Sequence, residues 1–204
     1  MLAKILEKVV AIPQVYDGVQ RLAGREENYR RLRPPLLRAK GEILLEAGAG
    51  TGEIARILDP TTRYLWLDND AQKLSGFRQK YPQGLAVMGS AAEIPLANAS
   101  VHTVLCIAVS HHLTDAELSQ MFAEFGRVCG RQLIFLDAVE QRSSPVSNLM
   151  WRYDRGSYPR KPERLTALLQ EHFVIEEIER YSILHHYLLC VAKPRAQGSV
   201  EHIN

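Results

Sequence analysis

The stretch ILLEAGAGTGEIARIL, residues 43–58, determines how this chain is interpreted. An apolar run containing Glu46 leads into Gly48, Gly50 and Gly52, and helix-forming residues follow at once. Alternating glycines let the main chain turn sharply and let a ligand approach the backbone closely. The stretch therefore predicts a strand, a tight turn and a helix, with a small-molecule site at the carboxyl end of the strand.

The same stretch does not match the common phosphate-binding motifs. A dinucleotide fingerprint would place a third glycine where this chain has Glu53, and no Gly-Lys-Ser/Thr ending of a P-loop is present. A carboxylate at Glu46 would also repel a pyrophosphate, whereas it would favour a ligand with a positive charge. The pattern therefore disfavours a diphosphate and favours a cofactor with a cationic end.

Short apolar runs alternate with helical segments on either side of this motif, which is typical of a parallel sheet covered on both faces. The last two runs are joined by only a few residues around Ser182, so we expect an antiparallel hairpin at the sheet edge. The predicted class is α/β, with a mostly parallel sheet of seven strands. The seven runs cover residues 43–47, 64–67, 85–88, 103–108, 133–136, 173–178 and 183–192.

Several helix boundaries are marked by their residues. Asp70 is placed to cap a helix over 71–81, and Thr114 with Glu117 forms a capping box. Another helix is expected over 162–171. The first forty residues have a helical pattern that is expected to stop at Pro34 and Pro35. We therefore divide the chain into a helical N-terminal cap (1–40), a ligand-binding catalytic domain (41–193) and a flexible tail (194–204).

The composition limits the classes of protein that fit. The chain has 204 residues, of which 46% are hydrophobic and 24% charged, so it can bury the core of one folded domain. No apolar run approaches the roughly 18 residues of a membrane span. Three cysteines are an odd number and none has the spacing of a metal site, which indicates reduced thiols in a cytoplasmic protein without a metal.

Asp68 ends the second apolar run, eighteen residues beyond Gly50. A carboxylate at this position can accept hydrogen bonds from both ribose hydroxyls of a nucleoside. The alternative is that it only caps a helix, but Asp70 already serves that purpose. We therefore predict that Asp68 binds ribose, with Asn69 and Leu74 flanking the ribose and the adenine.

Four segments in this order resemble a known family: E-x-G-x-G-x-G at 46–52, the acid after the second run, GSAAEIPLANASVHTVLCIAVSHHL at 89–113 and GRVCGRQLIFLD at 126–137. Together they are similar to the class I S-adenosylmethionine-dependent methyltransferases, in particular the UbiE-like or "methyltransferase type 11" group, over residues 40–192. The resemblance implies a Rossmann-like methyltransferase fold. It also implies an enzyme that transfers a methyl group from S-adenosyl-L-methionine to a small-molecule acceptor by in-line displacement, with S-adenosyl-L-homocysteine as product.

The resemblance also implies which residues contact the cofactor. The methionine portion would be held by the residues of the glycine turn, the ribose by Asp68, and the adenine by the segment after the third strand. Residues at the end of the fourth strand would pass near the methionine end, and an aromatic residue of the N-terminal cap would close over the cofactor. In chain order these positions are Tyr16, Glu46, Gly48, Gly50, Gly52, Asp68, Ser90, Ala91, Ala92, Ile107 and Ala108.

Two positions depart from the family pattern. Ser90 stands where the family commonly has an aspartate that accepts a hydrogen bond from the adenine amino group, and a serine oxygen makes a weaker, neutral hydrogen bond there. His102 stands where an aspartate usually precedes the fourth strand. We expect these changes to affect the affinity for the cofactor rather than its identity.

A general base is needed only if the acceptor must lose a proton. His111 and His112 follow the fourth strand, whose end faces the transferred methyl group in this architecture, so they are the candidate catalytic residues. The alternative is that one histidine packs structurally and the other faces solvent.

The segment 143–165 contains the candidate acceptor pocket, namely Trp151, Tyr153, Arg155 and Tyr158. These residues either form an apolar wall with an arginine that meets an acidic group of the acceptor, or the aromatic residues only anchor a long loop.

Two other functions remain open. Seven basic residues against two acidic ones between positions 21 and 40 could follow the phosphates of RNA, so RNA or protein is an alternative acceptor. Nucleic acid is disfavoured because no separate binding domain fits in this length and an Asn/Asp-Pro-Pro-Tyr/Phe motif is absent after the fourth strand. A non-catalytic nucleotide-binding module of the same fold is the other alternative.

Overall fold

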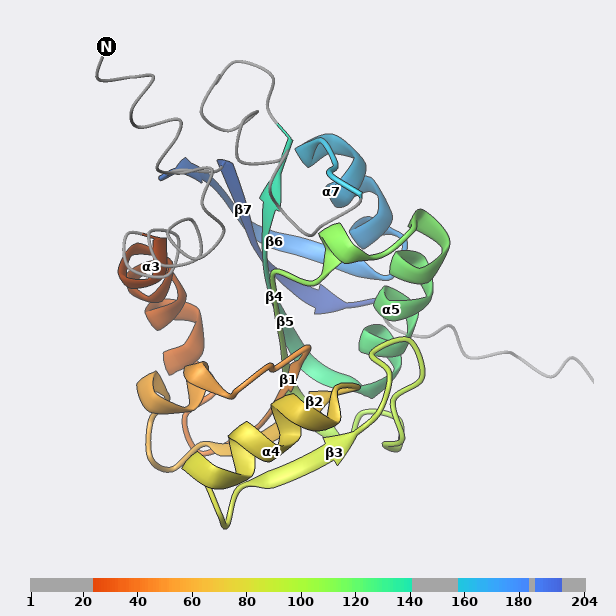
Figure 1. Cartoon of the computed structure of the whole chain (residues 1–204). Coiled ribbons are helices and arrows are strands. Elements are labelled where there is room, and N and C mark those ends of the chain that lie inside the picture. Colours follow the sequence, from red (N-terminus) through yellow and green to blue (C-terminus); the bar gives the residue numbers. More distant parts are fainter. Residues whose placement is uncertain (1–23, 141–157, 184–185, 196–204) are drawn as a thin grey trace, which may run out of the picture.

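A single sheet of seven strands organises the parts of the chain that the computed structural model describes, residues 24–140, 158–183 and 186–195. The strand order is β3-β2-β1-β4-β5-β7-β6 (Figure 1). The strands are β1 (Ile43–Ala47), β2 (Arg63–Asp68), β3 (Leu85–Met88), β4 (Val101–Ile107), β5 (Cys129–Val139), β6 (Phe173–Ser182) and β7 (His186–Pro194).

The direction of the strands confirms the predicted fold class. Strands β1 to β5 pair in parallel, and β7 pairs antiparallel with both β5 and β6. The predicted C-terminal hairpin is therefore present, with β7 inserted beside β5 and β6 at the edge. The carboxyl ends of β1 to β5 and of β6 share one edge of the sheet, which is where α/β folds of this kind bind ligands.

Helices cover both faces of the sheet (Figure 1). One face carries α3 (Arg25–Leu37), the 3₁₀ helix η2 (Glu53–Ile57) and α4 (Ala71–Lys80); the other carries α5 (Asp115–Val128) and α7 (Pro162–Gln170). Successive strand residues point to opposite faces, so Leu44 packs in the cluster with α3 while Leu45 packs in the cluster with α5 and α7. Burial on both faces explains why the strands read as continuous apolar runs.

The helix expected directly after the glycine turn is much shorter than the sequence pattern indicates. Only the five-residue 3₁₀ helix η2 forms, and it ends before Leu58, which is extended. Pro60 disfavours a helical conformation at Asp59, and the Asp59 carboxylate accepts a hydrogen bond from the Thr61 amide at 2.9 Å, which forms a turn. Pro60 and the turn at Asp59 therefore end the predicted helix after five residues.

Helix α3 also differs from the expectation, because it continues through Pro34 and Pro35 instead of stopping before them. Each proline removes one amide donor from the helix. Leu32 and Leu36 lie on either side of the prolines and both are buried in the core, so their packing against the sheet offsets the lost hydrogen bonds.

The predicted helix caps are confirmed. The Asp70 side chain accepts hydrogen bonds from the amides of Gln72 and Lys73 at the start of α4, and Thr114 and Glu117 form a capping box at the start of α5. Among the described residues, no helix has the length and apolar character needed to cross a membrane.

Candidate active site

A pocket of about 220 Å³ lies at the carboxyl ends of β1, β2, β3 and β4. One wall follows the glycine turn and the end of β2, a second wall is the segment after β3, and a third comes from the end of β4 and the start of α5. The lining residues are Gly48, Asp68, Asn69, Gly89, Ser90, Ala91, Ala92, Val109, Leu113 and Glu117.

The glycine turn brings the ends of β1 and β4 into contact. Gly48 has a φ of +71°, and a Cβ atom built on it would lie 2.3 Å from Cγ2 of Val109. Around Gly50 the situation is the opposite, because a Cβ there would meet nothing within 4 Å. Gly48 is thus required by close packing, while the backbone at Gly50 faces open space that a ligand could fill.

Asp68 connects the turn to the end of β2. Its carboxylate accepts hydrogen bonds from the Gly50 amide at 2.9 Å and the Asp70 amide at 3.0 Å, and the Lys73 ammonium lies 3.6 Å away. A carboxylate has about four acceptor positions. Asp68 therefore holds the turn in place and retains acceptor positions for two hydroxyl donors in the pocket.

Glu46 lies below the turn rather than in the pocket wall. It is 4% exposed, and its carboxyl group accepts a hydrogen bond from the Tyr64 hydroxyl. Burial raises the pKa of Glu46 to about 8, with a smaller opposing effect from the Tyr64 hydrogen bond. At neutral pH Glu46 is therefore mostly protonated and carries little negative charge, so its repulsion of a pyrophosphate is weak. A diphosphate is still disfavoured, because Glu53 stands where the dinucleotide motif has a glycine.

The structure brings several of the predicted cofactor residues together and leaves others outside the pocket. Asn69, Ser90, Ala91 and Ala92 line it with Gly48 and Asp68. Leu74 packs beside Trp66 and Phe77. Four other predicted residues do not belong to the lining, namely Gly50, Gly52, Ile107 and Ala108, of which Ala108 directly precedes the lining residue Val109. Tyr16 lies outside the described residues.

The two positions that depart from the family pattern have local partners. The Ser90 hydroxyl accepts a hydrogen bond from the Ala92 amide at 3.1 Å, which shapes the wall opposite Asp68. Nδ1 of His102 accepts a hydrogen bond from the Ile43 amide at 3.3 Å, far from the pocket. His102 thus holds the start of β1, whereas Ser90 belongs to the site.

His111 forms a buried pair with a carboxylate that sequence analysis did not assign. Nδ1 of His111 lies 2.6 Å from Oδ1 of Asp137, at the end of β5. The other oxygen of Asp137 accepts hydrogen bonds from the amide and the hydroxyl of Ser110, at 2.7 and 2.6 Å. Burial by itself would raise the pKa of Asp137, but the hydrogen bonds from His111 and Ser110 outweigh it and lower that pKa.

An ionised Asp137 accepts hydrogen bonds only, so it requires the proton of the imidazole to be on Nδ1. Nε2 is then the basic nitrogen of the ring. The neighbouring ring of His112 lies 4.2 Å away between centroids, but this side chain is exposed and is not bonded to Asp137. Of the two predicted histidines, His111 therefore has the environment of a general base.

A buried arginine fixes the turn that carries His111. The guanidinium of Arg160 is bonded to the carbonyl oxygens of Ser110 and Leu113, which bracket the 3₁₀ helix η3 (Ser110–His112), and to the carboxylate of Asp115. The amide of Tyr158 donates to the carbonyl of His111 at 3.0 Å. Tyr158 and Arg160 thus act on the turn through its backbone.

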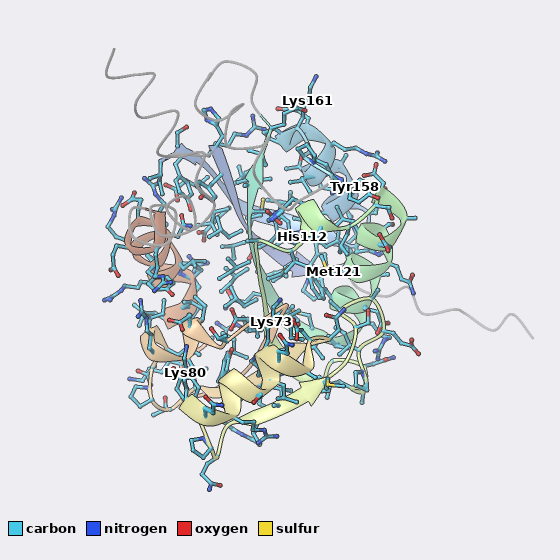
Figure 2. All side chains as sticks on the ribbon, in the orientation of Figure 1. Lys73, Lys80, His112, Met121, Tyr158 and Lys161 are labelled. Carbon is cyan, nitrogen blue, oxygen red and sulfur yellow. The ribbon has the colours of Figure 1, made fainter. Side chains whose placement is uncertain are left out.

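The predicted acceptor pocket is described only in part. Of its four residues, Trp151, Tyr153 and Arg155 lie outside the described residues. Tyr158 is 42% exposed, and Figure 2 places it beside α7. Arg160, which lies in the same segment, pairs with Asp115 of this chain.

The residue that sequence analysis missed is Asp137. The signal was present, because Asp137 ends a buried apolar run in the same way as Asp68 does. Since β4 and β5 are parallel neighbours, a residue at the end of one must approach the turn that follows the other. Among the described residues, no cluster of His, Cys, Asp or Glu is suited to a metal ion.

The pocket fits an adenosine-containing sulfonium cofactor. Asp68 is 5% exposed with unused acceptor positions, and the backbone at Gly50 faces unfilled space. The small side chains of Ala91 and Ala92 leave room for a flat ring against the wall after β3. Asp68 and Asn69 would hold the ribose, Ser90 to Ala92 the adenine, and Gly48 with the turn the amino acid portion.

Comparison with known proteins supports this assignment. A methyltransferase domain family matches residues 44–132. A probable S-adenosylmethionine-dependent methyltransferase of Mycolicibacterium smegmatis is 34% identical over 124 residues, which are 57% of this chain and 48% of that protein. An uncharacterized methyltransferase of Mycobacterium bovis is 30% identical over 132 residues, 62% of this chain and 54% of that protein. The chain thus spans about half the length of these curated relatives.

Solved structures show the same fold. Magnesium protoporphyrin IX methyltransferase from Synechocystis, solved with bound S-adenosylhomocysteine, has a TM-score of 0.70 at 18% identity and covers 84% of both chains. Geranyl diphosphate C-methyltransferase from Streptomyces coelicolor has a TM-score of 0.67 at 12% identity, over 84% of this chain and 81% of that one. The sheet order and these solved structures show that the chain has the fold of class I S-adenosylmethionine-dependent methyltransferases, and the matched domain and relatives show that it is similar to them in sequence.

Proposed function

We propose that this protein is an enzyme that transfers a methyl group from S-adenosylmethionine to a small-molecule acceptor, with His111 as general base. The observation that carries the proposal is the hydrogen-bonded pair of His111 and Asp137, since His111 lies in the chain between Val109 and Leu113, which both line the cofactor pocket. A nucleotide-binding module without a reaction would have no use for a carboxylate-oriented imidazole at this place.

The cofactor supplies a methyl group on a positively charged sulfur, which leaves as the neutral thioether of S-adenosylhomocysteine. The protein has to place the acceptor atom in line with that methyl group and to exclude water. Nε2 of His111 takes the proton that the acceptor loses, and Asp137 holds the ring and stabilises the charge that forms on it. Asp137 is therefore a positioning residue.

Two observations favour a small molecule over RNA as the acceptor. The described part of the chain forms one α/β unit, and Arg30, Arg31 and Arg38 of its basic segment are already paired with Glu27, Glu179 and Glu177. These pairs reduce the positive charge available for the phosphates of RNA, so the basic segment gives little support to RNA as the acceptor. Magnesium protoporphyrin IX and geranyl diphosphate, in the names of two structural neighbours, are likewise small molecules.

Cofactor binding is the first test. Calorimetry should show binding of S-adenosylmethionine and S-adenosylhomocysteine, no tighter binding of NADH, and a loss of at least tenfold in Asp68→Ala. Asp59→Ala is the matched control, because Asp59 ends η2 away from the pocket. Stronger binding of NADH, or equal affinity of Asp68→Ala and wild type, would refute the cofactor assignment.

Methyl transfer is the second test. The protein is incubated with methyl-labelled cofactor and with separate metabolite, RNA and protein fractions, and the label should appear in the metabolites. Label in RNA or protein would favour the other acceptor classes, and none in any fraction would favour the non-catalytic module.

The role of the pair is tested with variants once labelled product is found. His111→Ala should lower kcat by about 10²- to 10⁴-fold, the usual contribution of a general base, while the exposed His112→Ala should change it much less. Asp137→Asn should lower kcat and also move the acidic limb of the pH–rate profile to lower pH, since an anion no longer stabilises the imidazolium. An unchanged pH profile in Asp137→Asn would mean that Asp137 is only structural.

A further inference from the structure

A second and larger pocket, of about 550 Å³, lies at the same sheet edge but beyond β5. It is formed by the end of β5, the end of β6, the start of β7 and the start of α7, and we call it the β5–β7–β6 pocket. The cofactor pocket includes none of its residues, whereas Lys161, Pro162 and Glu163 lie in the segment 143–165, where the sequence predicts the acceptor pocket. A pocket of this size is in the range that small-molecule ligands occupy.

This pocket is lined by two cationic side chains, Lys161 and Arg180, and by two carboxylates, Glu140 and Glu163. The ammonium of Lys161 has no ion pair within the described residues, and Figure 2 shows Lys161 at the outer end of the molecule beside α7. The guanidinium of Arg180 is bonded to Glu163 at 3.1 Å, so the charge of that carboxylate is offset. The other carboxylate, Glu140, already has an interaction partner.

Two polar side chains of the pocket offer hydrogen bonds to an anion as well. The imidazole of His186 lies in the wall, with Nδ1 2.6 Å from the hydroxyl of Ser182. An imidazole and a hydroxyl can both donate hydrogen bonds to anionic oxygens.

The distance between the two sites limits the shape of a ligand that reaches both. Val139 and His186 are paired across β5 and β7, and Asp137 lies two residues before Val139 on β5. Neighbouring strands lie about 4.8 Å apart, so the turn of His111 after β4 is about 10 Å from β7. A molecule with one end in each place would be extended over about that length.

We propose that the β5–β7–β6 pocket binds an anionic group of the methyl acceptor, a carboxylate or a phosphate, about 10 Å from the atom that is methylated. Lys161 and Arg180 are the specificity-determining residues. This inference rests on the proposed function, since it assumes that the methylated atom lies near His111.

The test uses the full chain saturated with S-adenosylhomocysteine and two probes of equal length, 8-hydroxyoctanoate and 8-amino-1-octanol. Ligand-observed NMR should show binding of the carboxylate at up to about 10 mM and much weaker binding of the amine. Lys161→Met with Arg180→Met should weaken carboxylate binding at least tenfold. Lys193→Met is the matched control, because Lys193 pairs with Glu176 at the opposite end of β7 and its loss should change nothing.

Retained affinity for S-adenosylhomocysteine shows that the double variant is folded. Binding of the amine as tightly as the carboxylate, no binding of the carboxylate, or an unaffected double variant would each overturn the inference. 8-Phosphonooxyoctan-1-ol in place of the carboxylate distinguishes a phosphate from a carboxylate site by the tighter binder.

Failure of the inference can be told apart from failure of the proposed function. If labelled methyl groups appear only in neutral or cationic metabolites, the enzyme assignment holds and the anion site is wrong. If the acceptor is anionic, the double variant should raise KM at least tenfold with little change in kcat. If nothing is methylated but the carboxylate binds through Lys161 and Arg180, the site exists and the proposed function fails.

Discussion

The two halves of the ligand-binding edge are built in different ways. Over β1, β2 and β3 the pocket consists of main chain and small side chains, with Asp68 as its anionic anchor. Over β4 and β5 the structure depends on charged side chains, Asp137 and Arg160, which hold the turn of His111 through buried hydrogen bonds. In the first half, glycines without side chains leave room for a ligand, whereas in the second half Asp137 and Arg160 hold His111 in place.

This difference determines how each half should respond to substitution. A site made of main chain tolerates no added volume, because interiors are close-packed and glycine conformations with positive φ exclude side chains. A site made of a polar network depends on each partner, because a buried group that loses its partner bears the full cost of desolvation. Substitutions that add volume to the first half or remove a partner from the second test this contrast.

Gly48→Ala should have the largest effect. The new Cβ would lie 2.3 Å from Val109 and would require a φ of +71° at an alanine. Overpacking and the left-handed conformation together should cost about 4 kcal/mol of unfolding free energy. Urea denaturation measures the loss, and calorimetry should show that binding of S-adenosylhomocysteine is lost with it.

Gly41→Ala is the control for Gly48→Ala, because Gly41 has a similar φ of +75° with nothing near its Cβ. Gly41→Ala should lose only the unfolding free energy that the left-handed conformation costs, about 1 to 2 kcal/mol. Adding Val109→Ala to Gly48→Ala should remove the clash and so recover the unfolding free energy lost to overpacking. Equal losses in the two glycine variants would show that the contact between β1 and β4 is unimportant.

Arg160→Met should be next, with a loss of about 3 kcal/mol. The side chain is 6% exposed, and its removal leaves the Leu113 carbonyl without this donor and the Ser110 carbonyl with only the Leu113 amide. Arg164→Met is the control on the surface, because Arg164 pairs with the same Asp115 but is 53% exposed. This variant should lose about 0.5 kcal/mol of unfolding free energy or less. Thermal unfolding of both variants measures the difference, and similar losses would contradict a buried clamp.

The same contrast explains what could be predicted from the sequence. The glycine turn, Asp68 and the cap at Asp70 are local features, whose geometry is fixed by residues close together in the chain. The alternation of apolar runs likewise predicted a mostly parallel sheet, because burial on both faces leaves a clear pattern. These parts of the fold and the site were therefore accessible from the sequence.

The half of the site over β4 and β5 could not be predicted from the sequence in the same way. The pair of Asp137 with His111 spans 26 positions and the bond from Arg160 to Ser110 spans 50, and no local pattern specifies either of them. The extension of α3 through Pro34 and Pro35 also depends on tertiary packing, which outweighs the local preference. Sequence analysis named His111 but could not choose between it and His112 without Asp137.

The buried carboxyl of Glu46 gives a prediction about pH. Below pH 4.5, its ordinary pKa, the group is protonated in both folded and unfolded states; above it the unfolded chain releases the proton while the folded one keeps it up to about pH 8. Stability should therefore fall between pH 5 and 8 in wild type relative to Glu46→Gln, by at most about 1.4 kcal/mol per pH unit.

Urea denaturation at several pH values measures this dependence for Glu46. The side chain of Glu26 is 78% exposed, so Glu26→Gln should keep the wild-type pH dependence. Parallel curves for wild type and Glu46→Gln would mean that Glu46 is ionised in the folded protein, and would restore the fixed negative charge below the glycine turn.

The smallest effect is expected where the two halves meet. Ala108 directly follows β4 and precedes Val109, and it has a φ of +55°, a left-handed conformation that costs an alanine about 1 to 2 kcal/mol. Ala108→Gly removes this cost but adds entropy to the unfolded chain, so it should stabilise the protein by less than about 1 kcal/mol. Ala99→Gly, at a φ of +49° in the loop before β4, should give the same gain.

Strain of this kind is retained where the surroundings use it, so only Ala108→Gly should also weaken S-adenosylhomocysteine binding, by a few-fold, because Val109 is then held less firmly against Gly48. Equal cofactor affinity in both variants would show that the strain at Ala108 is a by-product of the turn and that the main-chain half of the site does not depend on it.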